Sequence, residues 1–290
     1  MTSRTCAVLP LSLLVLFACG EDGLQNPSQP TTATPRPRGD RAAASPGAAR
    51  RGTTTVGVYR PSELTFYLRN TNDAGEPEVT VAFGARDDVP LAGDWDGNGT
   101  TTIGTYRPAD STFHLRNENT PGEPDVVVAF GKSGDVPVVG DWDGNGTTTV
   151  GVFRPSAGSL LVRNANAAGE PEATVKSELL GGMPVAGDWD GNGTATFGLY
   201  ATRKKTFFQL RNSHGTEAAG PDSVRVDFGQ EHDVPVAGDW DGNGTTTVGV
   251  YRPSSSTFLL RNANASGEPD VTVAFGRAGD VPIVGNWDGK

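Results

Sequence analysis

The sequence predicts an all-β fold, a β-propeller with five blades of four antiparallel strands, and three observations support this prediction. The motif GDWDGNG occurs four times, beginning at Gly93, Gly140, Gly187 and Gly238, so that successive copies are 47, 47 and 51 residues apart. A period of this length is the size of a four-stranded propeller blade. Each period also contains four short strand patterns. The first unit lacks one strand and the C-terminal end has one strand left over, so the two ends together form one complete unit.

The four strand patterns are clearest in the first period, at residues 55–61, 65–70, 79–84 and 89–95. Apolar side chains alternate within them, with Phe66 and Leu68 on one face and Val79, Val81 and Phe83 on another, as half-buried strands require. The connecting segments are rich in Gly, Asn and Pro, which favour hairpin turns. Sustained helical periodicity is absent from the sequence.

The ends of the repeat region predict how the ring closes. A fifth copy of the motif, GNWDGK, begins at Gly285 and stops at Lys290, whereas the first unit begins at Gly52 without its preceding strand and loop. Pairing the last strand with the first would complete one blade and remove both exposed edges. An open β-solenoid or a linear array is the alternative, and a 47-residue unit of four short strands fits it less well.

The N-terminal segment predicts export. Residues 1–18 have the short apolar core of a signal peptide, and LFAC at 16–19 resembles the lipobox of bacterial lipoproteins, in which the cysteine is lipidated. We therefore expect a lipid on Cys19, a disordered Pro/Thr/Ala-rich tether over 19–51, and a propeller over 52–290. The expected location is a bacterial membrane, facing the periplasm or the cell surface. An ordinary secretory signal is the alternative.

Composition restricts the partners. The formal net charge is −10, which argues against nucleic acid as a ligand, because nucleic-acid binding needs a basic surface. The two cysteines, Cys6 and Cys19, both belong to the N-terminal segment, so we expect a mature domain without a disulfide.

The repeat resembles a known family. The AFG that ends in Phe83 and Gly84, the acidic glycine loop and the following VGVYRP pattern are similar to FG-GAP and VCBS repeats of secreted proteins. The resemblance covers about residues 52–290. It implies a propeller with calcium in the acidic loops and a binding or adhesive role instead of catalysis.

The acidic loops are candidate calcium sites. In DWDGNGTTT, side-chain oxygens at positions 1, 3 and 5 and a backbone carbonyl at position 7 have the spacing of a loop that wraps a hard cation. Threonine occupies position 9, where the family has an acid, so we expect weak affinity, with a Kd of about 0.1 to 1 mM. The alternative is that these side chains only form turns. The candidate ligands are Asp94, Asp96, Asn98 and Thr100; Asp141, Asp143, Asn145 and Thr147; Asp188, Asp190, Asn192 and Thr194; and Asp239, Asp241, Asn243 and Thr245.

Tryptophan and arginine also recur in the repeat. All five tryptophans share one position in the motif and the strand parity of apolar neighbours, which predicts packing between blades, with sugar stacking as the alternative. The arginines of YRP and LRN are predicted to form ion pairs with the GEPE or GEPD loops, with an anion site as the alternative. The tryptophans are Trp95, Trp142, Trp189, Trp240 and Trp287.

Departures from the repeat indicate where a ligand could bind. In the fourth unit YRP is replaced by residues 200–202. Arg203, Lys204 and Lys205 follow directly and are predicted to contact an anionic glycan, although neutral drift would also explain them. No two histidines have the spacing of metal ligands, and no G-x-S-x-G motif is present. His214 is placed in an inserted loop. We expect a binding or adhesion module for a glycan or a protein and no enzyme. A purely structural calcium scaffold and, last, a hydrolase on the propeller face are the alternatives.

Overall fold

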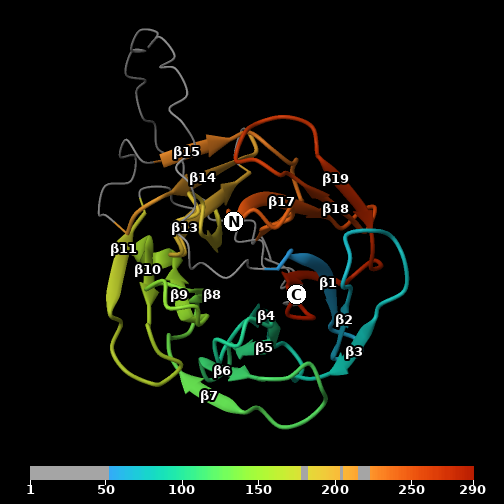
Figure 1. The fold of residues 1–290 in the computed structure, drawn as a ribbon. Coiled ribbons are helices and arrows are strands. Elements are labelled where there is room, and N and C mark those ends of the chain that lie inside the picture. Colours follow the sequence, from blue (N-terminus) through green and yellow to red (C-terminus); the bar gives the residue numbers. More distant parts are fainter. Residues whose placement is uncertain (1–51, 178–181, 203–204, 215–222) are drawn as a thin grey trace, which may run out of the picture.

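The computed structural model describes residues 52–177, 182–202, 205–214 and 223–290. Within these ranges the chain forms five sheets, each of four antiparallel strands, arranged around a central axis (Figure 1). The predicted five-bladed propeller is confirmed. The predicted signal peptide, Cys19 and the tether lie outside the described residues.

Each blade runs from an innermost strand near the axis to an outermost strand at the rim (Figure 1). Blade 1 contains β20 (Val281–Gly285), β1 (Thr55–Arg60), β2 (Thr65–Leu68) and β3 (Val79–Ala82). Blade 2 contains β4 (Val89–Gly93), β5 (Thr102–Arg107), β6 (Thr112–Leu115) and β7 (Val126–Ala129). Blade 3 contains β8 (Val136–Gly140), β9 (Thr149–Arg154), β10 (Ser159–Val162) and β11 (Ala173–Lys176), with a 3-10 turn at Pro155–Ala157. Blade 4 contains β12 (Met183–Gly187), β13 (Thr196–Ala201), β14 (Phe207–Arg211) and β15 (Ser223–Val226). Blade 5 contains β16 (Val234–Gly238), β17 (Thr247–Arg252), β18 (Thr257–Leu260) and β19 (Val271–Ala274).

The two ends of the repeat region close the ring in blade 1. Strand β20 pairs antiparallel with β1, and the register places Thr55 opposite Gly285 and Tyr59 opposite Val281. The hydroxyl of Thr55 also donates to the carbonyl of Gly285 over 3.0 Å. The predicted closure by terminal strands is therefore confirmed, and the open-array alternative is wrong.

The apolar core lies between blades. We call the contact between consecutive blades a joint, so that joint 2/3 is the contact of blades 2 and 3. In joint 2/3, Trp95, Tyr106 and Phe113 of blade 2 pack with Val150 and Val152 of blade 3. Because each strand alternates, its two faces contribute to two different joints. Each blade thus buries its apolar faces only by stacking on its neighbours.

Each tryptophan lies flat over glycines of its own blade. Trp95 is 5% exposed, and a Cβ on Gly93 would stand 2.6 Å from its Cζ3 atom. The indole nitrogen of Trp95 donates to the carbonyl of Ile103 over 3.2 Å. The predicted packing role is confirmed, and the sugar-stacking alternative is wrong because the rings are buried. No helix in the described part of the chain has the length and hydrophobicity that crossing a membrane would require.

Candidate functional site

The antiparallel blades send their connections to two ends of the ring. The loops between first and second strands and between third and fourth strands lie at one end, which we call the acidic end because the DWDGNG loops are there. The turns between second and third strands and the connections to the next blade lie at the opposite end, the turn end. The two ends carry different chemistry.

At the acidic end, each DWDGNG loop is closed by its own side chains. The carboxylate of Asp94 accepts hydrogen bonds from the backbone amides of Asn98 and Gly99 over 3.0 and 2.7 Å. The carboxylate of Asp96 accepts from the backbone and side-chain amides of Asn98 over 3.2 and 3.0 Å. Positive φ angles of 75° at Gly97 and 90° at Gly99 permit the bend. Partial burial raises the pKa of Asp94, and the amide donors oppose this shift.

The acidic loops also fasten each blade to the next. The amide of Thr148 donates to the carbonyl of Asp94 over 2.7 Å, and the amide of Asp94 donates to the Thr148 hydroxyl over 3.1 Å. The side-chain amide of Asn166 donates to the carbonyl of Thr148 over 2.9 Å. The two bonds between Asp94 and Thr148 link blades 2 and 3, and the same threonine recurs as Thr54, Thr101 and Thr246 at three other joints. A threonine three residues beyond the loop asparagine thus has a structural role.

The predicted calcium ligands accept hydrogen bonds within their own loop. Both oxygens of Asp94 and of Asp96 accept N–H bonds, and the Oδ1 atom of Asn98 accepts from the amide of Thr100 over 2.8 Å. The described residues also contain no cluster of three or more His, Cys, Asp or Glu side chains suited to a metal ion. Calcium therefore stays a prediction.

At the turn end, a buried aspartate joins three structural elements. Asp88 accepts from the Arg107 guanidinium over 3.0 and 3.1 Å and from the backbone amide of Ala85 over 2.9 Å. Its side chain is fully buried, and Tyr59 of the preceding blade lies beside it. Burial and then the charge of Asp88 raise the pKa of Tyr59 to about 12. We call this arrangement the aspartate clamp; it recurs with Asp135 and Arg154, with Asp233 and Arg252, and with Asp280 and Arg60.

The clamp was missed by the sequence analysis, which paired the YRP arginines with the GEPE or GEPD loops. That interpretation is wrong for the YRP arginines, whose partner is the aspartate of DVP. It is confirmed for the LRN arginines: Arg69 donates to the carboxylate of Glu78 and to the carbonyl of Glu76, over 2.8 and 2.5 Å. The DVP aspartate precedes four of the five innermost strands, and this recurrence was the available signal.

Joint 3/4 lacks the clamp and the threonine hydroxyl bond, but it keeps the backbone bond of the acidic end: the amide of Ala195 donates to the carbonyl of Asp141 over 2.7 Å. At the turn end Phe153, Gly182 and Ala201 stand where the other joints have tyrosine, aspartate and arginine. At the acidic end, alanine (Ala195) replaces the threonine and His214 replaces the asparagine. His214 lies in the connection between β14 and β15, as predicted, at the position that asparagine holds in the other blades. Its ring packs edge-on against Trp142, with centroids 6.3 Å apart, and burial lowers the pKa of His214.

The blades diverge toward the rim, and a groove of about 710 Å³ lies between blades 4 and 5. We call it groove 4/5 and name the corresponding place at other joints in the same way. Its walls carry Lys205, Gln230, Glu231, Glu268 and the clamp arginine Arg252, and its apolar contacts are Leu259 and Pro269. Of the predicted glycan-contacting residues, Lys205 lines this groove, whereas Arg203 and Lys204 lie outside the described residues. Their predicted role stays a prediction.

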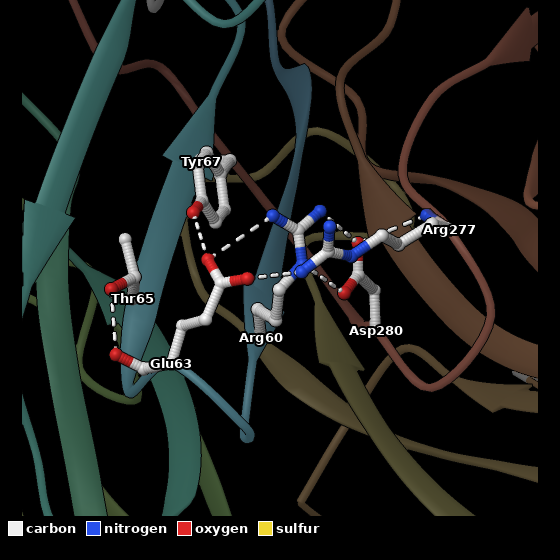
Figure 2. Close-up of polar contacts among 6 residues, drawn as sticks. All are labelled: Arg60, Glu63, Thr65, Tyr67, Arg277 and Asp280. Carbon is white, nitrogen blue, oxygen red and sulfur yellow. Dashed lines mark hydrogen bonds and ion pairs between the residues drawn. The ribbon is translucent and has the colours of Figure 1, made fainter.

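Groove 5/1 contains a dense polar network (Figure 2). Arg60 lies over the Tyr67 ring, 4.2 Å from its centroid, and donates to both carboxylate oxygens of Asp280 over 2.8 and 2.9 Å. The carboxylate of Glu63 accepts from Tyr67, Arg277 and Arg60. The hydrogen bond from Tyr67 and then the contact with Arg277 lower the pKa of Glu63, which keeps it ionised.

Comparison with known proteins adds little to this description. No known protein family matches the chain by sequence, and no curated protein matches it. The resemblance to FG-GAP and VCBS repeats therefore stays a prediction. Among solved structures, a lectin of Agrocybe aegerita, described as recognising non-reducing terminal N-acetylglucosamine, is similar with a TM-score of 0.40 and 15% identity. The alignment covers 71% of this chain and only 60% of the lectin chain.

Proposed function

We propose that this protein is a glycan-binding module and that groove 4/5 holds the sugar. The observation that carries the proposal is a groove of about 710 Å³ whose side chains include hydrogen-bonding groups that the fold does not use. Among the described residues, the Gln230 amide and the carboxylates of Glu231 and Glu268 have no hydrogen bond or ion pair. Binding sites are concave and combine apolar walls with a few convergent polar groups.

The groups in groove 4/5 suit the hydroxyls of a sugar. Carboxylates accept hydrogen bonds from hydroxyl groups, an amide both donates and accepts, and Lys205 donates. Leu259 and Pro269 supply apolar contacts for the C–H faces of a sugar ring. Arg252 is neutralised by Asp233, so one lysine, Lys205, and two unpaired carboxylates remain among the charged groups that line the groove. This balance favours a neutral, hydroxyl-rich ligand within the described part of the groove.

The surface supports a glycan over a protein partner. Across the residues that the structure describes, Val127 is the single large hydrophobic side chain that is exposed, at 55%. Protein interfaces are anchored by buried aromatic, methionine or arginine residues at their centres. Because exposed apolar anchors of this kind are missing from the described surface, a polar ligand is the better match.

The scaffold would hold the groove rigidly. The clamp arginine Arg252 lines the groove and is held by Asp233, and the amide of Asp227 donates to the hydroxyl of Ser266 across the joint over 2.9 Å. A binding site whose walls are already ordered loses less conformational entropy when the ligand arrives. Groove 4/5 thus has both the exposed polar groups and the fixed frame that sugar recognition needs.

We also propose that the protein is exported and is attached to a membrane through a lipid on Cys19. The support is the signal-like pattern of residues 1–18 and the LFAC sequence. A glycan-binding domain would then be presented outside the cytoplasm on a tether of about 30 residues, which reaches ~30 Å. In cell fractionation, Cys19→Ala should move the protein to the soluble fraction; continued membrane association would contradict the anchor.

A glycan array probed with the full-length protein tests the proposed function. We expect binding to a neutral glycan, and we expect Gln230→Ala and Glu268→Ala each to weaken it about tenfold, the loss expected when a hydrogen bond to a charged or amide group disappears. Glu170 is the matched control because it holds the place of Glu268 in groove 2/3. Equal losses from Glu170→Ala, or no binding to any glycan, would contradict the assignment.

A further inference from the structure

We propose that groove 5/1 contains a carboxylate site for an acidic saccharide, and that the side chain of Glu63 occupies this site until a ligand replaces it. The proposal rests on the proposed function only for the ligand being a saccharide. The site itself is argued from Arg60, Tyr67 and Arg277, which surround one carboxylate (Figure 2).

The three donors recognise both oxygens of a carboxylate. Arg277 donates to the Oε1 atom of Glu63, whereas Arg60 and Tyr67 donate to Oε2, Arg60 over 3.4 Å. Figure 2 shows the carboxylate between the two guanidinium groups and the phenol. Two oxygens served by separate donors match the planar carboxylate geometry. A uronic acid offers the same group on a sugar ring.

The site is held in place without Glu63. The Nε and Nη2 atoms of Arg60 bind the two oxygens of Asp280, whose side chain is 1% exposed. The guanidinium is also stacked on Tyr67. Its Nη1 atom is therefore fixed and directed outward by contacts that do not involve Glu63. Without the Glu63 carboxylate, Arg60 and Arg277 outweigh Asp280 by one positive charge.

Glu63 is attached in a way that lets its side chain leave. Its backbone amide donates to the carbonyl of Arg60 over 3.0 Å, and its carbonyl accepts from the Thr65 hydroxyl over 2.8 Å. These backbone contacts hold the turn independently of the carboxylate. The side chain of Glu63 is 41% exposed, and exposed ion pairs are weak because solvent screens them. A ligand carboxylate can therefore take its place at little cost.

Grooves 1/2 and 2/3, which the structure describes in full, lack this set of donors. In groove 1/2 the corresponding residues are Asp110, His114 and Ala85, and Asp110 accepts from the hydroxyl of Thr112 over 2.5 Å instead of from a guanidinium. In groove 2/3 leucine (Leu161) holds the place of Tyr67. Of grooves 5/1, 1/2 and 2/3, groove 5/1 alone combines two arginines with a phenol at this position.

The test compares wild type and Glu63→Ala in the full-length protein, using methyl α-D-galacturonide as the carboxylate probe and methyl α-D-galactoside as its neutral counterpart. We expect Glu63→Ala to bind the galacturonide about fivefold more tightly in calorimetry, because the internal competitor is removed. Adding Arg277→Ala to this variant should abolish the gain in affinity. The neutral galactoside should bind wild type and Glu63→Ala with the same affinity. The matched control, Asp110→Ala, should leave galacturonide affinity unchanged.

Three results would overturn the proposal: no gain in Glu63→Ala, a gain that survives Arg277→Ala, or a gain of the same size in Asp110→Ala. Tighter binding of a glutamate-containing peptide than of the galacturonide would assign the site to a protein partner instead. Failure here leaves the glycan assignment of groove 4/5 intact, since that assignment is tested with Gln230 and Glu268 variants and neutral glycans. A nuclear magnetic resonance titration of the Arg60 and Arg277 side-chain signals in wild type checks the site without any substitution.

Discussion

Joints 2/3 and 3/4 both hold two neighbouring blades together, but they do so with different residues. Joint 2/3 combines an apolar core with an aspartate clamp of Asp135 and Arg154. Joint 3/4 keeps the apolar core but has no clamp, and Phe153 instead stacks on Phe197 with centroids 5.5 Å apart. The clamp residues are replaced as a set, so no buried charge is left without a partner. The comparison indicates that packing holds a joint whose clamp is replaced as a set, while the backbone bond from Ala195 to Asp141 is kept at the acidic end.

The largest effect is expected from the feature that both joints share. Trp95→Ala in joint 2/3 and Trp142→Ala in joint 3/4 should each lower the free energy of unfolding by about 3 to 5 kcal/mol, because both rings are almost fully buried. Denaturant unfolding monitored by circular dichroism measures both. A much smaller loss for Trp142→Ala would show that joint 3/4 is not held by packing.

The clamp should show strong non-additivity. Asp135→Gly alone should cost about 3 kcal/mol, because it leaves the partly buried guanidinium of Arg154 unpaired. The triple variant Tyr106→Phe, Asp135→Gly and Arg154→Ala reproduces the residues of joint 3/4 and should cost less than the sum of its single variants. Additive losses in denaturant unfolding would contradict the view that the three residues act as one unit.

Calcium would sharpen the comparison at the acidic end. Threonine at position 9 of each loop stands where an acid would strengthen binding, so weak affinity is expected; with a Kd of about 1 mM, 10 mM calcium would add ~1.4 kcal/mol per site. Calorimetry with calcium and with a chelator measures the change in Tm. An unchanged Tm would assign Asp94, Asp96 and their counterparts to turn formation alone.

His214 should make joint 3/4 sensitive to pH. Burial and the neighbouring charge of Arg211 lower the pKa of His214 in the folded state below its unfolded value of about 6.5. The unfolded chain then binds more protons, so stability is lost as the pH falls below about 6.5 toward the folded pKa. Unfolding measured across this range should show the loss.

The variant His214→Asn restores the residue found at the other joints. It should remove this pH dependence and add about 1 kcal/mol, through a hydrogen bond like that of Asn166 to Thr148. His114→Leu is the control, because His114 is a second histidine whose pKa burial lowers. If His214→Asn keeps the full pH dependence and His114→Leu removes it, the sensitivity lies outside joint 3/4.

The smallest effect on stability is expected from the basic turn of blade 4. Replacing Arg203, Lys204 and Lys205 by serine should leave Tm unchanged, because Lys205 is exposed and has no ion pair within the described residues. If the predicted contact with an anionic glycan is correct, the same variant should weaken salt-sensitive binding on a glycan array. Unchanged binding would show that these three residues do not contribute to glycan binding.

The repeat made the ring predictable, because Trp95 and its four counterparts mark the blades and Gly285 reveals the incomplete unit. Strand alternation at Phe66 and Leu68 gave the buried faces. The candidate ligand sites were harder to predict, since Arg277 is far from Glu63 and Tyr67 in sequence and meets them only when β20 closes the ring. Groove 4/5 likewise combines residues of two blades, and neither half has a motif of its own.

The most direct test of the central claim is to locate a bound glycan on the protein. In a nuclear magnetic resonance titration with a neutral glycan found on the array, we predict that the largest shifts occur in groove 4/5, at Gln230, Leu259 and Glu268. The acidic end, including Asp96 and Asn98, should show no comparable shifts. Shifts confined to the acidic end would contradict the account, as would the absence of binding.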